Sequence, residues 1–446
     1  MTAREATGRG DRAVSKLQAL VRIPTVSNRD PALVDTDAFD RLLAELERQF
    51  PLLHQRLELT RIPTHALLFR WPGASAERPV VLMAHLDVVP VDGPWTHPPF
   101  SGVVADGSIW GRGTLDDKGC VAGICEAVET LLEDGHVPAQ DVWLFFGCDE
   151  EVSGPAAGLA VDELERRGVR PWFVLDEGGA VAGEAFPGVA VPVGAIGVTE
   201  KGLTSLELRV EGRGGHASTP ARMGPTARLA RAITRLDRSS MPASTPEPTL
   251  ELLRRLAPHA PFPLRPLLAR AARLGPALTR ALIAAGPESA AMTRTTFAVT
   301  TLSGSPALNV VASTARAGVN IRIMVGDTVA DVLRHVRRVV ADDRVHIDVV
   351  ERNEPSPVSP RDDAFRLLES TIGDVFADAV PAPYVMMAAT DARFFTRICD
   401  RVYRFAPFRM TRAQRESIHS YDEHLGVDAF GTGIRWYRRL IEKLPR

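Results

Sequence analysis

The stretch Val80-Val81-Leu82-Met83-Ala84-His85-Leu86-Asp87 decides the fold class of this 446-residue chain. A run of apolar residues predicts a buried strand, and an imidazole and a carboxylate follow where that strand ends. Two more short apolar runs, residues 142–146 and 172–175, also end in acidic residues. Helical patterns at residues 36–49 and 118–133 alternate with these strands. This alternation predicts an α/β catalytic domain of three layers, with a mixed, largely parallel sheet at its centre.

Side chains of the kinds that bind metals follow the predicted strands, and one further pair opens the helix at 118–133. Because parallel strands place their carboxyl ends at one edge of a sheet, these side chains should converge in one crevice. Taken singly, each carboxylate could equally cap a helix or face solvent. Together they would repel one another without a compensating cation. The clusters are His85-Leu86-Asp87, Asp116-Asp117, Asp149-Glu150-Glu151 and Asp176-Glu177.

Counting charges favours two metal ions over one. Three carboxylates with two neutral imidazoles carry three negative charges, which two divalent cations and one bridging hydroxide would neutralise. Imidazole and carboxylate ligands suit zinc, and cobalt or manganese can occupy the same ligand set. The sequence therefore predicts a dinuclear site.

The spacing within two clusters indicates separate roles. His85 and Asp87 lie two residues apart in an extended segment, so they share a face, and Asp87 can accept the imidazole N–H. Glu150 and Glu151 are adjacent and point differently, so one can bind metal while the other acts as general base.

The pattern changes near Val198. Residues 198–355 predict a smaller α+β lid or dimerisation domain, with strands at 205–210, 315–325 and 345–351 and helices at 225–236 and 328–340. Within it, residues 239–294 predict a helical insertion that serves as a lid or packing element. Its prolines interrupt the long apolar face that a membrane-surface helix would need. The catalytic domain then comprises residues 1–197 and 356–446.

Composition narrows the class of partner and the compartment. Basic residues number 53 and acidic residues 55, which disfavours a nucleic-acid or membrane partner. No apolar run approaches the roughly 18 residues that span a bilayer. The four cysteines form no CxxC pair, and the polar N-terminus lacks the apolar segment of a secretory signal. We expect a cytoplasmic protein.

With these residues assembled, the chain resembles the dizinc metallopeptidase family of aminoacylase, carboxypeptidase G, carboxypeptidase S and succinyl-diaminopimelate desuccinylase. The Leu-Asp-Glu-Gly-Gly form and the long insertion are most similar to the carboxypeptidase S branch. The motifs that carry the resemblance are His85-x-Asp87, Gly-Arg-Gly-x-x-Asp116-x-Lys-Gly, Asp-Glu150-Glu151, Asp176-Glu-Gly, Gly215-His216-Ala217-Ser218, Thr390-Asp391-Ala-Arg393 and Ile418-His419 with Glu423.

The resemblance implies two Zn²⁺ per subunit, with Co²⁺ or Mn²⁺ as alternatives. It also implies Glu150 as general base and Asp87 as the acid that orients a ligand. Asp116 would bridge both ions. The implied ligands are His85 and Asp176 at one ion, Glu151 and His419 at the other, and Asp116 at both. Four neighbours rank second: Asp117, Asp149, Glu177 and His424.

The lid would carry the substrate contacts. The resemblance implies that His216 steadies the developing oxyanion, often from across a dimer interface, and that Asn309 and Arg322 bind a substrate carboxylate. A guanidinium suits that task because it can pair with a carboxylate through two hydrogen bonds. A homodimer through the lid is one expectation. A monomer whose insertion completes the site is the other.

Our leading hypothesis is hydrolysis of an amide bond next to a free carboxylate, in a small peptide or N-acyl amino acid, by a dizinc-bound hydroxide. This is the metallocarboxypeptidase or dipeptidase type. The alternative is a narrow N-deacylase of the aminoacylase or desuccinylase kind. A catalytically inactive binding homologue is a further alternative, which the complete set of ligands disfavours.

Overall fold

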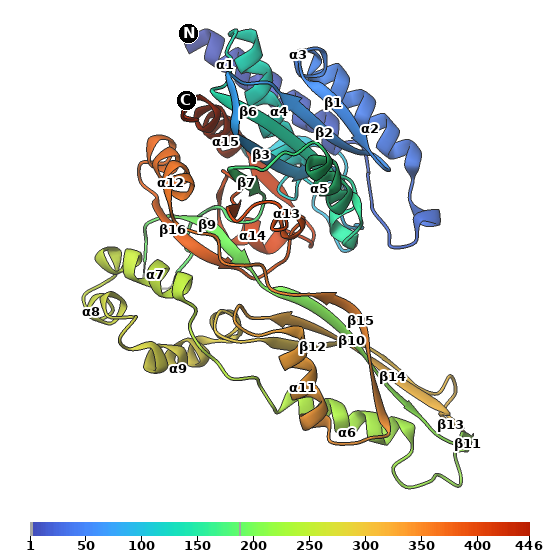
Figure 1. Ribbon diagram of the computed structural model, residues 1–446. Helices are drawn as coiled ribbons and strands as arrows, with labels where there is room; N and C mark the ends of the chain where they lie inside the picture. The colour runs from blue at the N-terminus through green and yellow to red at the C-terminus, as the bar shows by residue number, and fades with distance from the viewer. Residues whose placement is uncertain (1–2, 187–188) are drawn as a thin grey trace.

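The computed structural model describes residues 3–186 and 189–446, and a ten-stranded sheet forms the centre of its upper lobe (Figure 1). The strand order is β1-β2-β6-β3-β7-β17-β9-β8-β18, with β16 also paired to β9. The central strand β3 is parallel to both β6 and β7, so the carboxyl ends of these strands lie at one edge. Its strands are β1 (Glu58–Ile62), β2 (Ala66–Trp71), β3 (Ser75–His85), β6 (Gln140–Gly147), β7 (Phe173–Asp176), β8 (Val181–Ala182), β9 (Val193–Glu200), β16 (Val380–Met386), β17 (Val402–Arg404) and β18 (Arg409–Met410).

Helices cover both faces of this sheet. Alternate residues of β3 face opposite sides: Val80 and Leu82 join one apolar core with α1, α4 and α15, while Val81 and Met83 join another with α5 and α13. The predicted three-layer domain with a mixed, largely parallel sheet is confirmed. The helices are α1 (Ala3–Val21), η1 (Pro31–Leu33), α2 (Thr36–Gln49), α3 (Pro51–Arg56), α4 (Lys118–Glu133), η2 (Glu150–Val152), α5 (Ala156–Arg166), α12 (Asp363–Val375), α13 (Ala392–Phe395), α14 (Arg412–Ser417) and α15 (Val427–Glu442).

A small antiparallel sheet lies beside the carboxyl edge of the large one. It contains β4 (Val103–Ala105), β5 (Ser108–Trp110) and β19 (His424–Gly426). The turn at Asp106-Gly107 joins β4 to β5 with positive φ at both residues, as a tight hairpin of this sequence requires.

A four-stranded antiparallel sheet forms the lid, in the lower lobe of Figure 1. Leu206, Leu208 and Val210 are buried under α6 and α11, whereas the intervening Glu207 and Arg209 are partly exposed on the other face. The strand order is β12-β14-β10-β15, which leaves β12 and β15 at the edges. The lid elements are β10 (Gly202–Glu211), β11 (Gly215–His216), α6 (Pro225–Asp237), β12 (Thr296–Ser303), β13 (Val310–Val311), β14 (Thr314–Ile323), α11 (Val329–Val340) and β15 (Val345–Asn353).

The helical insertion sits within the lid sequence but packs on the catalytic sheet. Leu253 and Leu256 share an apolar cluster with Val193 of β9 and Ala382 of β16, and Arg255 pairs with Glu369 of α12. The insertion therefore braces the catalytic lobe from one side. Its helices are α7 (Glu247–Leu256), η3 (Ala257–His259), α8 (Arg265–Ala269), α9 (Gly275–Ala285) and α10 (Pro287–Ala291).

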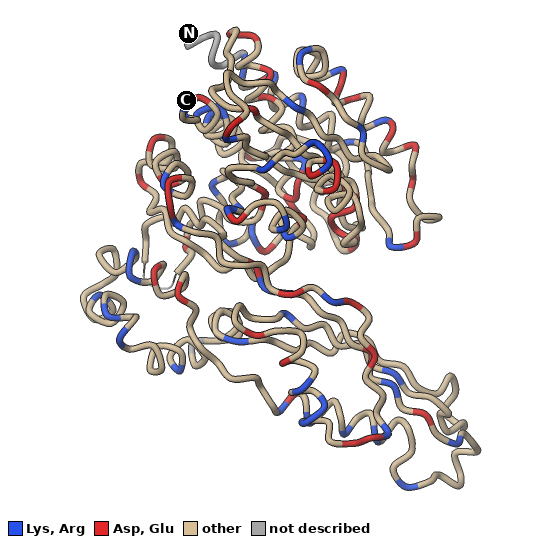
Figure 2. The backbone as a smooth tube through the Cα atoms, in the orientation of Figure 1, with Lys and Arg blue, Asp and Glu red and all other residues tan. Residues whose placement is uncertain are grey.

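Two chain segments connect the lobes. The first is Glu200-Lys201-Gly202, where β9 of the large sheet passes into β10 of the lid sheet, and the second is residues 353–356, after β15. Acidic and basic residues are interspersed along both lobes (Figure 2). Among the described residues, no helix is long and apolar enough to cross a bilayer.

Candidate metal centre

The three central parallel strands bring their terminal side chains to one place. His85 ends β3 and pairs with Gly147 at the end of β6, and Leu82 of β3 pairs with Leu175 of β7. Glu150 and Glu151 begin η2 directly after β6, and Asp176 ends β7. The expected crevice at the carboxyl ends of these strands is therefore formed.

Asp116 lies between two imidazoles. Its Oδ1 is 2.9 Å from Nε2 of His85, and its Oδ2 is 2.9 Å from Nε2 of His419. His419 follows α14 and has a φ of 60°, a left-handed conformation that is uncommon outside glycine and that often marks a functional site. One carboxylate thus joins residues that are more than 300 positions apart, in the arrangement expected of a bridging ligand.

Glu151 and Asp87 occupy distinct positions around these imidazoles. Oε2 of Glu151 is 3.0 Å from Nε2 of His419. Asp87 is fully buried, and Nδ1 of His85, on the ring side opposite Asp116, lies 2.9 Å from its backbone carbonyl oxygen and 3.3 Å from its Oδ1. The same carboxylate accepts the backbone N–H groups of Glu150 and Glu151, at 3.2 and 3.1 Å. Asp87 therefore orients the His85 ring and also holds the start of η2.

The structure separates Asp176 from its neighbour Glu177. Both oxygens of Asp176 accept backbone N–H groups, from Glu177 at 2.9 Å and from Ala392 at 2.8 Å. Oε1 of Glu177 lies 3.6 Å from Nε2 of His85. The motif pointed to Asp176 as the ligand, but it is Glu177 that approaches the imidazole. Adjacent residues beyond a strand end point in different directions, and sequence alone does not indicate which one faces the site.

A buried ion pair supports the Asp116 segment from behind. Glu423 is fully buried, accepts the backbone N–H groups of Leu115 and Asp116 at 2.8 and 3.1 Å, and pairs with Arg112 at 2.7 Å. Both Glu423 and Arg112 belong to the sequence motifs, which imply no role for either residue. Their spacing from two predicted ligands could have indicated a supporting role, because Arg112 precedes Asp116 by four residues and Glu423 follows His419 by four.

Carboxylates and imidazoles perturb one another strongly here. Hydrogen bonds that the protonated imidazole donates to Asp116 and Glu151 raise the pKa of His419 to about 10. Burial alone would lower the pKa of His85, but nearby carboxylates outweigh it and raise that pKa well above its usual range. Burial, reinforced by neighbouring acids, raises the pKa of Glu150. Protons therefore balance the charge of this site, and divalent cations could replace them.

The donor set fits metal ions. Among the described residues, two groups offer ligand atoms that all lie within 4.8 Å of one another: His85, Asp116 and Glu151, and His85, Asp117 and Glu177. Oε1 of Glu151 and Oδ1 of Asp117 are buried without a hydrogen-bond partner. Unpaired buried carboxylate oxygens are costly unless a cation or a donor meets them. Two overlapping groups of hard and borderline ligands are what a dinuclear site needs.

The residues predicted to bind substrate lie at opposite ends of the lid. Arg322 is on β14 opposite Leu203, near the crossing from the catalytic lobe, and burial lowers its pKa while Glu351 and Glu150 raise it. His216 and Asn309 belong to the β11–β13 segment, at the end of the lid far from the catalytic lobe (Figure 1). Arg322 is thus within electrostatic reach of Glu150, and His216 and Asn309 of the same chain are distant from the site.

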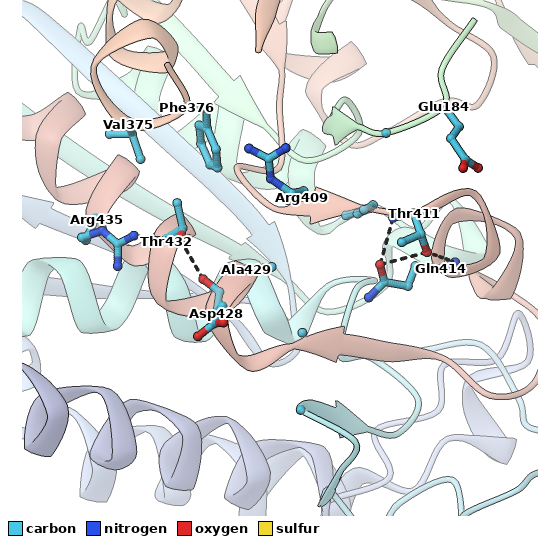
Figure 3. A pocket seen from close by; sticks show the side chains of 14 residues that line it. Glu184, Val375, Phe376, Arg409, Thr411, Gln414, Asp428, Ala429, Thr432 and Arg435 are labelled. Atoms are coloured by element: carbon cyan, nitrogen blue, oxygen red, sulfur yellow. Dashed lines mark hydrogen bonds between the residues drawn. The ribbon is translucent and has the colours of Figure 1, made fainter. Parts of the chain in front are cut away.

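A separate cavity of about 590 Å³ lies on the catalytic lobe (Figure 3). Thr411 and Gln414 at the start of α14 line it, together with Arg409, Arg435 and Asp428. None of the described residues that line it is a predicted ligand, base or substrate contact. Its connection to the site is indirect, through α14, which leads to His419.

A carboxyl-edge site of acids and imidazoles, in a sheet domain that carries a second, smaller lobe, is typical of a metallohydrolase. Residues 81–443 match the family described as Peptidase family M20/M25/M40. Since that match covers most of the chain, the protein belongs to this family. The predicted class, a metal-dependent hydrolase related to carboxypeptidase S, is confirmed.

Several members of this family are similar in sequence to this chain over most of their length. "Probable carboxypeptidase S-like 2" of Dictyostelium discoideum is 35% identical, over 92% of this chain and 82% of the relative. "N-fatty-acyl-amino acid synthase/hydrolase PM20D1" of Xenopus tropicalis is also 35% identical, over 96% and 85%. "Carboxypeptidase S" of Saccharomyces cerevisiae is 29% identical, over 96% and 83%.

Solved structures share the fold at low identity. An M20 family metallo-carboxypeptidase from Sulfolobus solfataricus has a TM-score of 0.71 at 17% identity, covering 96% of this chain and 98% of that one. Human carnosine dipeptidase 1 has a TM-score of 0.70 at 16% identity, covering 98% and 97%. A Bacillus subtilis protein described as a dinuclear metal binding peptidase has a TM-score of 0.62 at 13% identity, covering 98% of each chain.

Proposed function

We propose that this enzyme hydrolyses an amide bond next to a free carboxylate, in N-acyl amino acids or small peptides. The observation that carries the proposal is the Asp116 carboxylate, placed 2.9 Å from each of two imidazoles and close to the half-buried acid Glu150. Relatives named as a carboxypeptidase and as an N-fatty-acyl-amino acid hydrolase support the same substrate class, since both act next to a carboxylate-bearing amino acid.

The proposed centre holds two Zn²⁺, with His85, Asp116, Glu151, His419 and Glu177 as ligands. Glu177 replaces Asp176 in this proposal because its Oε1 lies 3.6 Å from Nε2 of His85, whereas the Asp176 oxygens accept the backbone N–H groups of Glu177 and Ala392. When bound, such ions lower the pKa of a water molecule and polarise a carbonyl group. Co²⁺ and Mn²⁺ would fit the same ligands.

Glu150 is the proposed general base. No side chain hydrogen-bonds to its carboxylate among the interactions of the described residues, and it begins η2 beside Glu151, which lies 3.0 Å from His419. It would accept a proton from the attacking water and deliver it to the leaving nitrogen. Asp87 would keep His85 in one tautomer and orientation.

Two guanidinium groups are available for the substrate carboxylate. Arg322 reaches toward the site from the lid. Arg393 lies above the ring of Phe394 at 4.6 Å, and its Nε and Nη2 are buried with no hydrogen-bond partner. A carboxylate could accept from either guanidinium in the planar two-bond geometry that arginine offers.

A homodimer through the lid would explain the position of His216. His216 is exposed, and within its own chain its Nδ1 contacts only Ser218, at 2.7 Å, among the side chains described. The edge strand β12 is exposed over residues 298–303 and bears the apolar Leu302, which is 70% exposed. An unpaired edge of this kind can pair with a second copy. We therefore propose that His216 and Asn309 act on the partner's site.

A substrate panel with metal analysis tests the proposed reaction. Turnover of dipeptides, N-acetyl amino acids and long-chain N-acyl amino acids should be measured beside esters of the same amino acids that lack the free carboxylate. We expect hydrolysis only of members with a free carboxylate, and about two zinc ions per chain. A strict preference for one acyl group would favour the narrow N-deacylase. A metal-loaded protein that is inert across the panel would contradict the proposal and favour a binding homologue.

The cytoplasmic location stays a prediction. The four cysteines are free and buried, which supports a reducing compartment.

A further inference from the structure

Glu200 is a buried acid at the point where the chain leaves the catalytic sheet. It ends β9 and is 1% exposed. Its Oε1 accepts a hydrogen bond from Oγ of Ser356 at 2.9 Å. Its Oε2 accepts from the backbone N–H of Thr390 at 3.0 Å, from the Thr390 hydroxyl at 3.2 Å and from Nε of Arg404 at 3.1 Å. Both oxygens are therefore fully used.

The partners of Glu200 come from three separate parts of the chain. Ser356 lies in the second crossing, where the chain returns from the lid. Arg404 ends β17, next to Asp176 of β7 in the parallel ladder, and its Nη2 donates to Oγ of Ser356 at 3.3 Å. The two crossings also bind each other directly, because the hydroxyl of Thr199 donates to the Ser356 carbonyl at 2.6 Å. One carboxylate thus joins both crossings to the catalytic sheet.

Thr390, the third partner, begins the segment that leads into α13, beside the end of β6. The far end of this segment is held by Asp176, which accepts the Ala392 N–H at 2.8 Å. Between these two anchors lies Asp391, which is 3% exposed and adjoins Gly147 at the end of β6. Arg393 follows, with its Nη1 donating to the Thr390 carbonyl at 2.8 Å and its Nε and Nη2 unpaired. The position of Arg393 therefore depends on the anchors at Glu200 and Asp176.

Stability alone is a weak reason for this arrangement. Arg404 is 0% exposed and Glu200 1% exposed, so both charges have lost their hydration. A buried ion pair is often no more stabilising than apolar side chains of the same volume, but it enforces one geometry because every donor must meet its acceptor. A need to hold the two lobes in one relative arrangement explains the buried pair at this position better than added stability does.

We propose that Glu200 is a positioning residue that holds both lid crossings and the Thr390–Arg393 segment at the start of α13 in one arrangement, so that the angle of the lid and the position of this segment are set together. The kinetic part of this inference rests on the proposed hydrolase function. The structural part does not.

The first experiment compares two buried acids. Glu200→Gln keeps the shape but places an amide nitrogen against donors. Glu129→Gln is the matched control, because Glu129 is also buried and accepts backbone N–H groups, of Leu52 and Leu53, far from the crossings. We expect Glu200→Gln to raise KM about tenfold with kcat within about threefold, because the proposed substrate contact Arg393 is misplaced while the ligands remain. Glu129→Gln should lower Tm and leave KM unchanged, and both variants should keep the wild-type metal content.

The second experiment measures the lobes without any substrate. Spin labels at Arg366→Cys on α12 and Arg337→Cys on α11 report the distance between catalytic lobe and lid, since both positions are exposed and the four native cysteines are buried. In the labelled protein, Glu200→Gln should make the distance distribution about twofold broader, and Glu129→Gln should not change it. This readout stands even if the wild type hydrolyses no member of the substrate panel.

A Glu200→Gln variant with a wild-type KM and a wild-type distance distribution, and only a lower Tm, would overturn the proposal. If that variant fails to fold, Ser356→Ala and Thr390→Val decide, because each removes one hydroxyl donor to Glu200. Ser356→Ala should broaden the distances, and Thr390→Val should raise KM. No change in either variant would show that Glu200 is merely structural.

Discussion

The carboxyl edge of the catalytic sheet and the far end of the lid differ in how their histidines are held. At the sheet edge, His85 is 2% exposed and contacts carboxylates on both ring nitrogens. In the lid, His216 is exposed. Among the side chains described, its ring hydrogen-bonds only to Ser218, two residues further along the same turn. The comparison teaches that the acids and imidazoles of the proposed metal centre are gathered within one lobe, whereas His216 lies apart from them at the far end of the lid.

The largest expected effect tests the organised lobe. Glu150→Gln should lower kcat about 1,000-fold, because the proton acceptor is lost while the proposed ligands remain. Metal content, measured by elemental analysis, should equal that of the wild type. The control is Asp149→Asn, since Asp149 accepts the Ala156 N–H at the start of α5, and should cost little activity. Near-normal turnover of Glu150→Gln would remove Glu150 from the base role.

The next effect separates two adjacent acids within that lobe. Glu177→Gln should release one of two zinc ions and reduce turnover about several hundredfold, because its carboxylate faces His85. Asp176→Asn should keep both ions and lower Tm instead, because Asp176 caps backbone N–H groups. Zinc stoichiometry at equal free zinc distinguishes the two. Loss of an ion from Asp176→Asn alone would restore the motif-based assignment.

A smaller effect concerns the lid. His216→Ala should reduce kcat about 100-fold without changing zinc content, as loss of one group that stabilises an oxyanion does. If the proposed dimer forms, mixing His216→Ala with Glu150→Gln should recover part of the activity, because one site in the mixed dimer receives both intact residues. Sedimentation gives the oligomeric state. A His216→Ala variant that is monomeric and fully active would contradict the proposal that His216 acts on the site of a second copy.

The smallest effect compares two helix caps. The threonine–N3 capping boxes at Thr411 of α14 and Thr328 of α11 have the same chemistry in different lobes. Replacing either threonine by alanine should cost about 1 kcal/mol of stability. Only Thr411→Ala should also weaken zinc binding, because α14 leads directly to His419. Equal zinc affinity in both variants would show that α14 does not position His419.

Much of the fold could be predicted from the chain because the patterns were local. The run from Val80 to Ala84 has no polar residue, so it had to be a strand covered on both faces, and the Asp106-Gly107 turn fitted one hairpin geometry. The insertion was harder to place. Its helices were expected from composition, but its packing on β16 depends on contacts such as Leu253 with Ala382, which are distant in sequence.

The sequence by itself determined which residues have the chemistry: the imidazoles, the paired acids and their positions after strands, because the side-chain alternation of a strand and the edge of a parallel sheet follow from local pattern. Only the tertiary structure turned Glu177 rather than Asp176 toward His85, brought His419 to Asp116, and placed Glu200 between the two crossings. These outcomes depend on side-chain direction and on contacts between distant segments, which the backbone path sets and a linear pattern does not contain.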